Sequence, residues 1–248
     1  MPWKRFPTDK LLISRPRAWT DPMPAAEAEL QRLPRGRHGL PSEFIAENQR
    51  RRLLAAVPVA CAAKGYAKTA VTDIVEGAQV SRKTFYERFT DKEKCALAAF
   101  EVFAGELVEA VEGACKTRAA WPDRVGAGIA AGIEYLADDP PVAHFLSTGV
   151  VAVGPKGVAA QHALFERLAR GLAPGRTASP RAAWMSPESE WGLVAYLSML
   201  VARRVTGEAD RLTELTPELI QAALTPYVGP EEAHETAERS RLSRPNLP

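Results

Sequence analysis

The residues best suited to chemistry in this chain are hydrogen-bond donors gathered in Asp73–Phe89, DIVEGAQVSRKTFYERF. The donors at the centre of this run are Ser81, Arg82, Lys83, Thr84 and Tyr86. Hydroxyl, guanidinium and ammonium groups placed together can bind phosphate oxygens. The run therefore indicates binding of a polyanion.

Two short helices joined by a tight turn are needed to position these donors. The inner faces come from Ile74, Val75 and Ala78 in the first helix and from Phe85 and Phe89 in the second. Ser81 is a predicted N-cap, so the second helix exposes its donors at the end where the backbone dipole favours anions. This arrangement predicts a helix-turn-helix whose second helix enters the major groove. The alternative is a solvated face on a small packing unit.

The flanking sequence predicts the helices that support this unit. An amphipathic helix begins near Ser42 and runs to Lys64, where Gly65 ends it, and Pro58 predicts a kink within it. Thr72 is expected to cap the first short helix of the motif, and Asp91 the long helix that follows it.

The segment Gly65–Glu93, GYAKTAVTDIVEGAQVSRKTFYERFTDKE, resembles the TetR family of transcriptional regulators. It has a glycine closing helix 1, a threonine starting helix 2, a turn ending in Val-Ser, an aromatic-rich recognition helix and a Lys-Glu opening of helix 4. Gln79 stands where a turn glycine is common. The resemblance implies that Thr72 and Lys92 bind phosphate and that Tyr86 contacts a phosphate or a base. It also implies that four residues face the major groove: Ser81, Arg82, Lys83 and Thr84.

The charge of the chain is divided unevenly along its 248 residues. Residues 1–95 hold 18 Lys and Arg against 11 Asp and Glu, whereas residues 96–248 hold 14 against 19. This predicts a basic module for a polyanion, followed by a larger acidic module with another task. The absence of a long apolar run or a signal peptide predicts a cytoplasmic protein without a membrane partner.

The expected fold is all-α, because alternation with period two is never sustained. Four regions are expected: a flexible basic extension (1–40), a three-helix helix-turn-helix DNA-binding domain (41–95), an effector-binding and dimerisation domain (96–230) and a flexible tail (231–248). The resemblance implies a homodimer on a palindromic double-stranded DNA operator, with Glu188–Val205 and Thr216–Val228 pairing with their symmetry mates. The alternative is that these two helices are core elements of a monomer.

The resemblance implies that the second domain binds a small-molecule effector. The candidate pocket residues are Phe103, Tyr135, His144, Phe165, Trp191 and Tyr196. Each is individually more typical of a core, but as a set they predict an apolar cavity with a few polar handles. The leading expectation is thus a ligand-responsive repressor; the alternative is a helical binding protein or enzyme without specific DNA binding.

Enzymatic signatures are weak in this sequence. The glycine-rich stretch Gly126–Gly132 follows no predicted strand, and no nucleophile elbow is visible. Cys61, Cys95 and Cys115 lack the spacing of a zinc site and are expected to be small buried hydrophobes. We therefore expect no catalytic residues, no metal and no cofactor.

A basic stretch, LPRGRHGLPSEF (Leu33–Phe44), precedes the first predicted helix. Its Arg35 and Arg37 resemble the Arg-Gly-Arg core of an AT-hook. A flexible arm here could lay both arginines in the minor groove beside the major-groove site. The alternative is a basic linker that raises only non-specific affinity.

Overall fold

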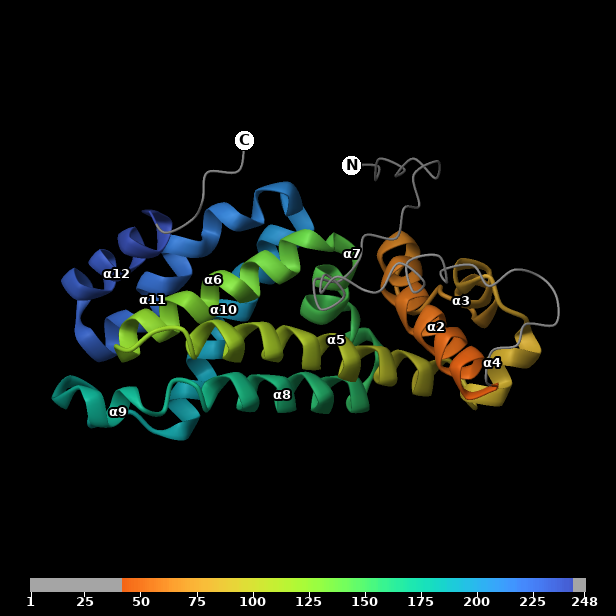
Figure 1. Ribbon diagram of the computed structural model, residues 1–248, viewed down its shortest axis with the longest axis horizontal. Helices are drawn as coiled ribbons and strands as arrows, with labels where there is room; N and C mark the ends of the chain where they lie inside the picture. Colours follow the sequence, from red (N-terminus) through yellow and green to blue (C-terminus); the bar gives the residue numbers. More distant parts are fainter. Residues whose placement is uncertain (1–41, 243–248) are drawn as a thin grey trace.

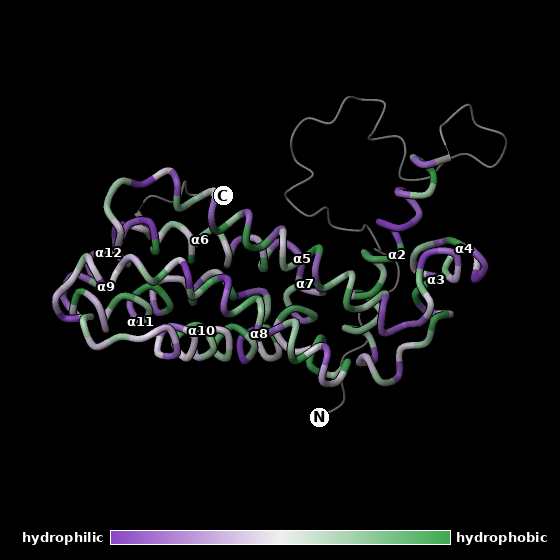
Figure 2. The backbone as a smooth tube through the Cα atoms, turned by 90° about the horizontal axis from the view of Figure 1, so that it is seen from below, coloured by the Kyte–Doolittle hydropathy of each residue, from purple (hydrophilic) through white to green (hydrophobic). Residues whose placement is uncertain are grey.

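The computed structural model describes residues 42–242, and every regular element in this range is helical (Figure 1). The predicted all-α fold is therefore confirmed. Hydrophobic and hydrophilic stretches alternate along the helices, as amphipathic packing requires (Figure 2). None of the described helices is long and apolar enough to cross a membrane. Arg35 and Arg37 lie outside the described residues.

Three helices form the head at one end of the molecule: α2 (Ser42–Lys64), α3 (Val71–Ala78) and α4 (Arg82–Arg88). Helix α2 is one continuous helix that includes Pro58, and it ends before Gly65, whose φ of +78° suits glycine. Leu53, Ile74 and Phe85 are fully buried where the three helices meet. The apolar spacing seen in the sequence thus forms the core of the head.

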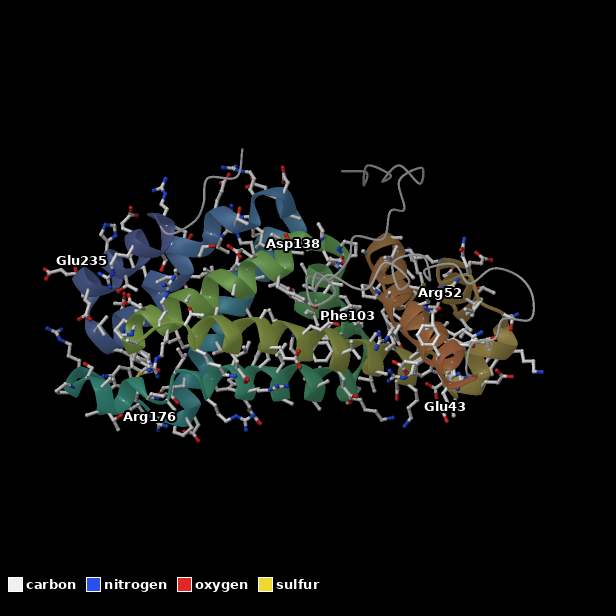
Figure 3. All side chains as sticks on the ribbon, in the orientation of Figure 1. Glu43, Arg52, Phe103, Asp138, Arg176 and Glu235 are labelled. Atoms are coloured by element: carbon white, nitrogen blue, oxygen red, sulfur yellow. The ribbon has the colours of Figure 1, made fainter. Side chains whose placement is uncertain are left out.

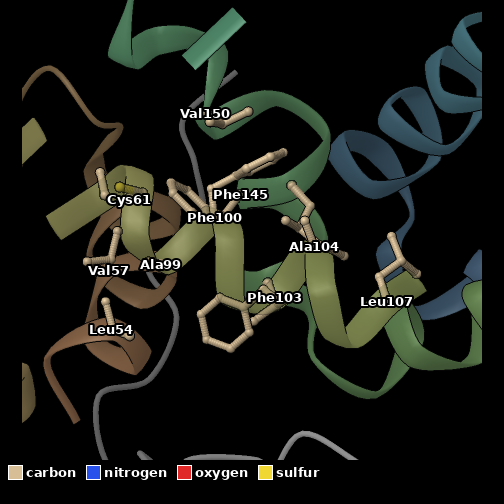
Figure 4. Packing of buried hydrophobic residues seen from close by; sticks show 14 of the residues in the cluster. Leu54, Val57, Cys61, Ala99, Phe100, Phe103, Ala104, Leu107, Phe145 and Val150 are labelled. Carbon is tan, nitrogen blue, oxygen red and sulfur yellow. The ribbon is translucent and has the colours of Figure 1, made fainter. Parts of the chain in front are cut away.

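Helix α5 (Lys92–Cys115) joins the head to the second module. Near its N-terminus Ala99 and Phe100 lie beside Val57 and Cys61 of α2 (Figure 4). Burial raises the pKa of the Cys95 thiol to about 12, which agrees with its predicted role as a small apolar residue. Because α5 runs without a break past residue 95, the expected boundary at 95/96 falls inside a helix.

The second module is built around α5 and the helices that follow it. They are α6 (Trp121–Asp138), α7 (Pro140–His144), a π-helical turn (Phe145–Gly149), a 3-10 turn (Val151–Val153), α8 (Pro155–Ala169), α9 (Gly175–Ala178), a 3-10 turn (Pro180–Ala182), α10 (Pro187–Gly207), a 3-10 segment (Ala209–Leu215), α11 (Thr216–Val228) and α12 (Pro230–Leu242). Helices α5, α6 and α8 lie along the long axis of the molecule (Figure 1).

Close packing of α5 and α6 explains the glycine-rich stretch Gly126–Gly132. A Cβ at Gly128 would lie 2.8 Å from the Cys115 Sγ, and one at Gly132 would lie 3.1 Å from a methyl of Val111. The thiol of Cys115 donates a hydrogen bond to the carbonyl of Arg124 at 3.2 Å. Small residues therefore let the two helices approach each other.

The expectation of a flexible tail from residue 231 is wrong for residues 231–242, which form most of α12. Ala233, Thr236 and Ala237 are buried against the rest of the module. A Cβ at Gly126 of α6 would lie 2.8 Å from the hydroxyl of Ser240, so the contact between α6 and α12 is close. The apolar stripe of α12 consists of small residues, which made the helix hard to recognise by hydropathy.

Candidate nucleic-acid interface and effector cavity

The first turn of α4 is held in place by the cap that its sequence predicts. The Ser81 hydroxyl accepts a hydrogen bond from the Thr84 N–H at 3.0 Å, and the two side-chain hydroxyls lie 2.9 Å apart. Phe85 is fully buried and its ring centroid lies 5.8 Å from that of Phe89. The buried aromatic residues thus fix the opposite face of α4 toward solvent.

The outer face of α4 presents Arg82, Lys83 and Tyr86, which are all exposed. The Tyr86 side chain is 55% exposed, and its ring packs edge-on against Phe85 with centroids 5.3 Å apart. The Lys83 Nζ lies 4.0 Å from a Glu87 carboxylate oxygen, in an exposed pair that contributes little to stability. These donors are available to a ligand on this face.

The turn between α3 and α4 is formed without the glycine that is common in the family. Gln79 takes a left-handed conformation, with φ 52° and ψ 45°. Its carbonyl accepts a hydrogen bond from the Arg52 guanidinium of α2 at 3.0 Å. The turn geometry is therefore retained, and Arg52 is a supporting residue that the sequence did not reveal.

The predicted cap of α3 is wrong. Helix α3 begins at Val71 with Ala70 as its N-cap, so Thr72 is the second residue of the helix. The Asp73 carboxylate accepts a hydrogen bond from the Ala70 N–H at 2.6 Å and pairs with the Lys64 Nζ at 2.6 Å. Both contacts lower the pKa of Asp73, and the contact with Lys64 has the larger effect. Thr72 stays half-buried at the helix N-terminus, where a phosphate would be favoured.

Lys92 is bound within the protein, which the sequence did not predict. Its ammonium donates to the carbonyl of Tyr66 at 2.8 Å and to that of Thr69 at 2.7 Å. It also lies 4.1 Å from the centre of the Tyr66 ring. Two of its three N–H groups therefore tie the start of α5 to the loop before α3, and one is left for a phosphate.

A cavity of about 620 Å³ lies between α5, α6, α8, α10 and α11. This volume is within the ordinary range for a small-molecule site. Its wall is largely aliphatic, as shown by Leu107, Val111, Ile133, Leu164 and Val201. Charged residues also line it: Glu112, Lys116, Arg124, Arg167 and Arg170.

Among the six predicted pocket residues, Phe165 lines this cavity and the other five lie outside its lining. Phe103 is buried in the core, where its carbonyl and the Glu106 carboxylate both accept hydrogen bonds from the Tyr135 hydroxyl, the second at 2.9 Å. Burial raises the pKa of Tyr135. Large aromatic rings fill space between helices, so they mark the packed core rather than the cavity.

The remaining candidates belong to other surroundings. His144 is half-buried, burial lowers its pKa, and its Nδ1 has no hydrogen-bond partner within residues 42–242. Trp191 packs against Phe165 with ring centroids 5.9 Å apart, behind the cavity wall. Tyr196 is 49% exposed on α10. Most of the cavity residues that the sequence analysis missed are aliphatic or glycine, and nothing in their local pattern distinguishes them from core. The others include Trp121 and five charged residues, whose local pattern is that of an ordinary helix surface.

The fold and the exposed face of α4 together define a helix-turn-helix DNA-binding protein with an additional helical module. Residues 59–99 match the sequence profile of bacterial regulatory proteins of the tetR family. The resemblance to the TetR family that the motif predicts is thus confirmed over these residues. A comparison with curated protein sequences found no match.

Solved structures share the fold across most of the described chain. The fatty acid degradation regulator FadR from Bacillus halodurans is 17% identical with a TM-score of 0.65, and the match covers 74% of this chain and 96% of FadR. FadR from Bacillus subtilis, solved with stearoyl-CoA, is 17% identical with a TM-score of 0.58, and the match covers 72% of this chain and 98% of that FadR. A putative TetR-family regulator from Syntrophomonas wolfei is 16% identical with a TM-score of 0.57, and the match covers 73% of this chain and 95% of that regulator.

Proposed function

We propose that this protein is a ligand-responsive, homodimeric repressor. It binds a palindromic operator through α3 and α4, and a small, largely apolar effector in the cavity releases it. The observation that carries the proposal is that one helix, α5, belongs to both sites. Cys95 and Phe100 pack in the head, whereas Leu107 and Val111 of the same helix line the cavity.

Transmission along α5 follows from its length and continuity. Its 24 residues span about 36 Å at 1.5 Å per residue. A ligand that shifts Leu107 or Val111 therefore displaces the start of the same helix, where Lys92 bonds the loop before α3. A change at the cavity thus alters the placement of the reading head, provided that the ligand prefers one placement over the other.

The DNA contacts are proposed from exposure and position. Arg82, Lys83 and Tyr86 would contact bases or phosphates from α4, with Ser81 and Thr84 at its N-terminal turn. Thr72 would bind a phosphate at the start of α3, and the third N–H of Lys92 would bind another. Arg35 and Arg37 would reach the minor groove from the N-terminal extension.

An apolar effector is supported by the aliphatic cavity wall. The FadR structure from Bacillus subtilis, whose fold the chain shares, was solved with stearoyl-CoA, a ligand with a long apolar chain. The effector-binding part of the proposed domain 96–230 would accordingly lie between α5, α6, α8, α10 and α11.

The proposed dimer interface is formed by α10, one of the two helices that the sequence analysis expected at the interface. On α10, Tyr196 is 49% and Met199 is 72% exposed. In contrast, Ile220 and Leu224 of α11 are fully buried within their own chain. An exposed apolar face suits self-association, and two heads are needed to read two half-sites.

The test uses DNA fragments that flank the coding region, with affinity measured by fluorescence anisotropy over a range of salt. We expect affinity to fall steeply with salt. Lys83→Ala combined with Tyr86→Ala should remove the preference for the best fragment, while the exposed control Arg241→Ala on α12 should keep it. Sedimentation should show a dimer that Met199→Glu weakens. Failure to retain any fragment at any salt concentration would favour a helical binding protein without specific DNA recognition.

A further inference from the structure

The charges that line the cavity have the opposite sign to the module that contains it. Residues 96–248 hold 14 Lys and Arg against 19 Asp and Glu. The cavity lining nevertheless includes the cations Lys116, Arg124, Arg167 and Arg170, with Glu112 as the carboxylate among its lining residues. This local excess of positive charge favours an anionic ligand group.

The four cations lie at one end of the cavity. Lys116 directly follows α5, Arg124 is in the first turn of α6, and Arg167 and Arg170 are at the end of α8. Helices α5 and α8 run away from the head and α6 runs back toward it, so these three helix ends lie together, far from the head (Figure 1).

The other end of the cavity is mainly aliphatic and carries no charged side chain among its described lining residues; its polar residues include Ser147 and Gln161, and the Gln161 amide donates to the Ser147 carbonyl at 3.1 Å. Leu107 of α5, Leu136 of α6 and Leu146 of the π-helical turn line it closer to the head. The side-chain view places Asp138, which ends α6, and Phe103 of α5 on this side, and Arg176 of α9 at the far end (Figure 3). The cavity is therefore polar at its distal end and aliphatic toward α7.

The distal cations are not used to hold the module together. Ion pairs in this module join other residues, such as Arg176 with Glu190 and Arg239 with Asp123. Within residues 42–242, none of the four cations pairs with a carboxylate. The Arg124 Nε donates to the carbonyl of Arg118 at 2.9 Å, and its two terminal amino groups are further donors.

A neutral donor accompanies these cations. Trp121, at the start of α6, lines the cavity, and its indole Nε1 is buried without a hydrogen-bond partner in the part of the chain that the structure describes. A buried N–H without a partner is unfavourable, and a ligand oxygen would satisfy it. The polar end thus combines positive charge with an unused donor.

We infer that the effector is an amphipathic anion, with its apolar chain along the aliphatic wall and its anionic head between the α5–α6 turn and the end of α8. This rests on the proposed role of the cavity as the effector site. Guanidinium and ammonium groups bind carboxylate and phosphate oxygens alike. A free carboxylate and a phosphate-bearing thioester are the two sources of this chemistry.

The test compares three probes that share one alkyl chain: dodecanol, dodecanoate and dodecanoyl-CoA. Binding to the full-length protein is measured by calorimetry at low and at high salt. We expect both anions, or the thioester alone, to bind more tightly than dodecanol, with an advantage that salt reduces. Binding of dodecanoate indicates a carboxylate head, whereas binding of the thioester alone indicates a phosphate-bearing one.

Substitutions in the cavity lining test where the anionic group of the effector binds. Arg167→Gln combined with Arg170→Gln should weaken binding of the anion about three- to tenfold, as expected for two exposed charge pairs, and leave dodecanol unchanged. Glu112→Gln should tighten anion binding. Arg181→Gln, which removes an exposed arginine at the same end but outside the lining, should change neither. Thermal melts verify that each variant folds.

Two results would overturn the inference in distinguishable ways. Dodecanol that binds as tightly as the anions, or that loses as much affinity as they do in the double arginine variant, would exclude the anionic head while keeping an apolar effector. No binding by any of the three probes would reject the inference together with the proposed role of the cavity.

Discussion

Replacing Lys92 with methionine would separate a structural role from a DNA contact. The substitution keeps the length of the side chain but removes the ammonium that donates to the carbonyls of Tyr66 and Thr69 at 2.8 and 2.7 Å. It also removes the charge above the Tyr66 ring. The loop before α3 would lose its bonds to α5.

The magnitude follows from these contacts. A hydrogen bond from a charged donor contributes roughly 1.5–3 kcal/mol, and a cation–π contact adds about 0.5–1 kcal/mol. Lys92 is half-buried, so solvent screens part of this energy and we expect a net loss of about 2 kcal/mol in the free energy of unfolding. For a chain of this size, the Tm should fall by roughly 4–8 °C.

The assay combines thermal unfolding followed by circular dichroism with DNA affinity measured over a range of salt. Lys92→Met should lower the Tm, because the loop loses its bonds to α5. It should also reduce the slope of log K against log salt by about 0.9, because the proposed phosphate contact of the third N–H is lost. Lys83→Met is the matched comparison: it should leave the Tm unchanged and reduce that slope by about 0.9 for each phosphate that the protein no longer neutralises. An unchanged Tm for Lys92→Met would refute the structural role of Lys92, and an unchanged slope would refute its phosphate contact.

Three further substitutions test other contacts. Gln79→Gly should raise the free energy of unfolding by about 0.5 kcal/mol, because glycine adopts the left-handed conformation without strain; a lower Tm would contradict this. Glu190→Gln should lower the free energy of unfolding by about 2 kcal/mol, because Arg176, 3.1 Å away, would lose its buried partner. The control is Glu214→Gln, which removes a carboxylate from an exposed pair. An equal effect of the two substitutions would count against the argument. Burial lowers the pKa of His144, so its contribution to stability is present above about pH 6.5 and is lost as the pH falls through the folded-state pKa, with a slope of at most about 1.4 kcal/mol per pH unit. In His144→Phe, the denaturation midpoint should change less between neutral and mildly acidic pH than in the unmodified protein. An identical pH profile in the variant would argue against this role of His144.

The head was predictable because its signals are local. The spacing of Ile74, Val75 and Ala78 and of Phe85 and Phe89 defines two buried faces, and the Ser81 cap lies three residues from the N–H that it binds. The misplaced start of α3 has a local cause as well. Asp73 reaches back to the Ala70 N–H and makes alanine the N-cap, although threonine has the better intrinsic preference.

Long-range contacts explain the errors made elsewhere. The bonds from Lys92 join residues far apart in the chain, and such a partner leaves no trace in the pattern around residue 92. The same holds for Arg52, whose guanidinium supports the turn at Gln79. The sequence analysis therefore assigned Lys92 only a phosphate contact and gave Arg52 no role.

The sequence by itself determined the helical class, the helix-turn-helix and its resemblance to the TetR family, because periodicity, caps and turns act over a few residues. Only the tertiary structure decided where the cavity lies and which side chains line it. A cavity is the space that several packed helices leave unfilled, so its wall depends on how α5, α6, α8 and α10 approach one another. Among the aromatic candidates chosen from the sequence, Phe103 and Tyr135 fill the core and Tyr196 is exposed. The cavity is enclosed mainly by glycines, aliphatic side chains and cations from separate helices.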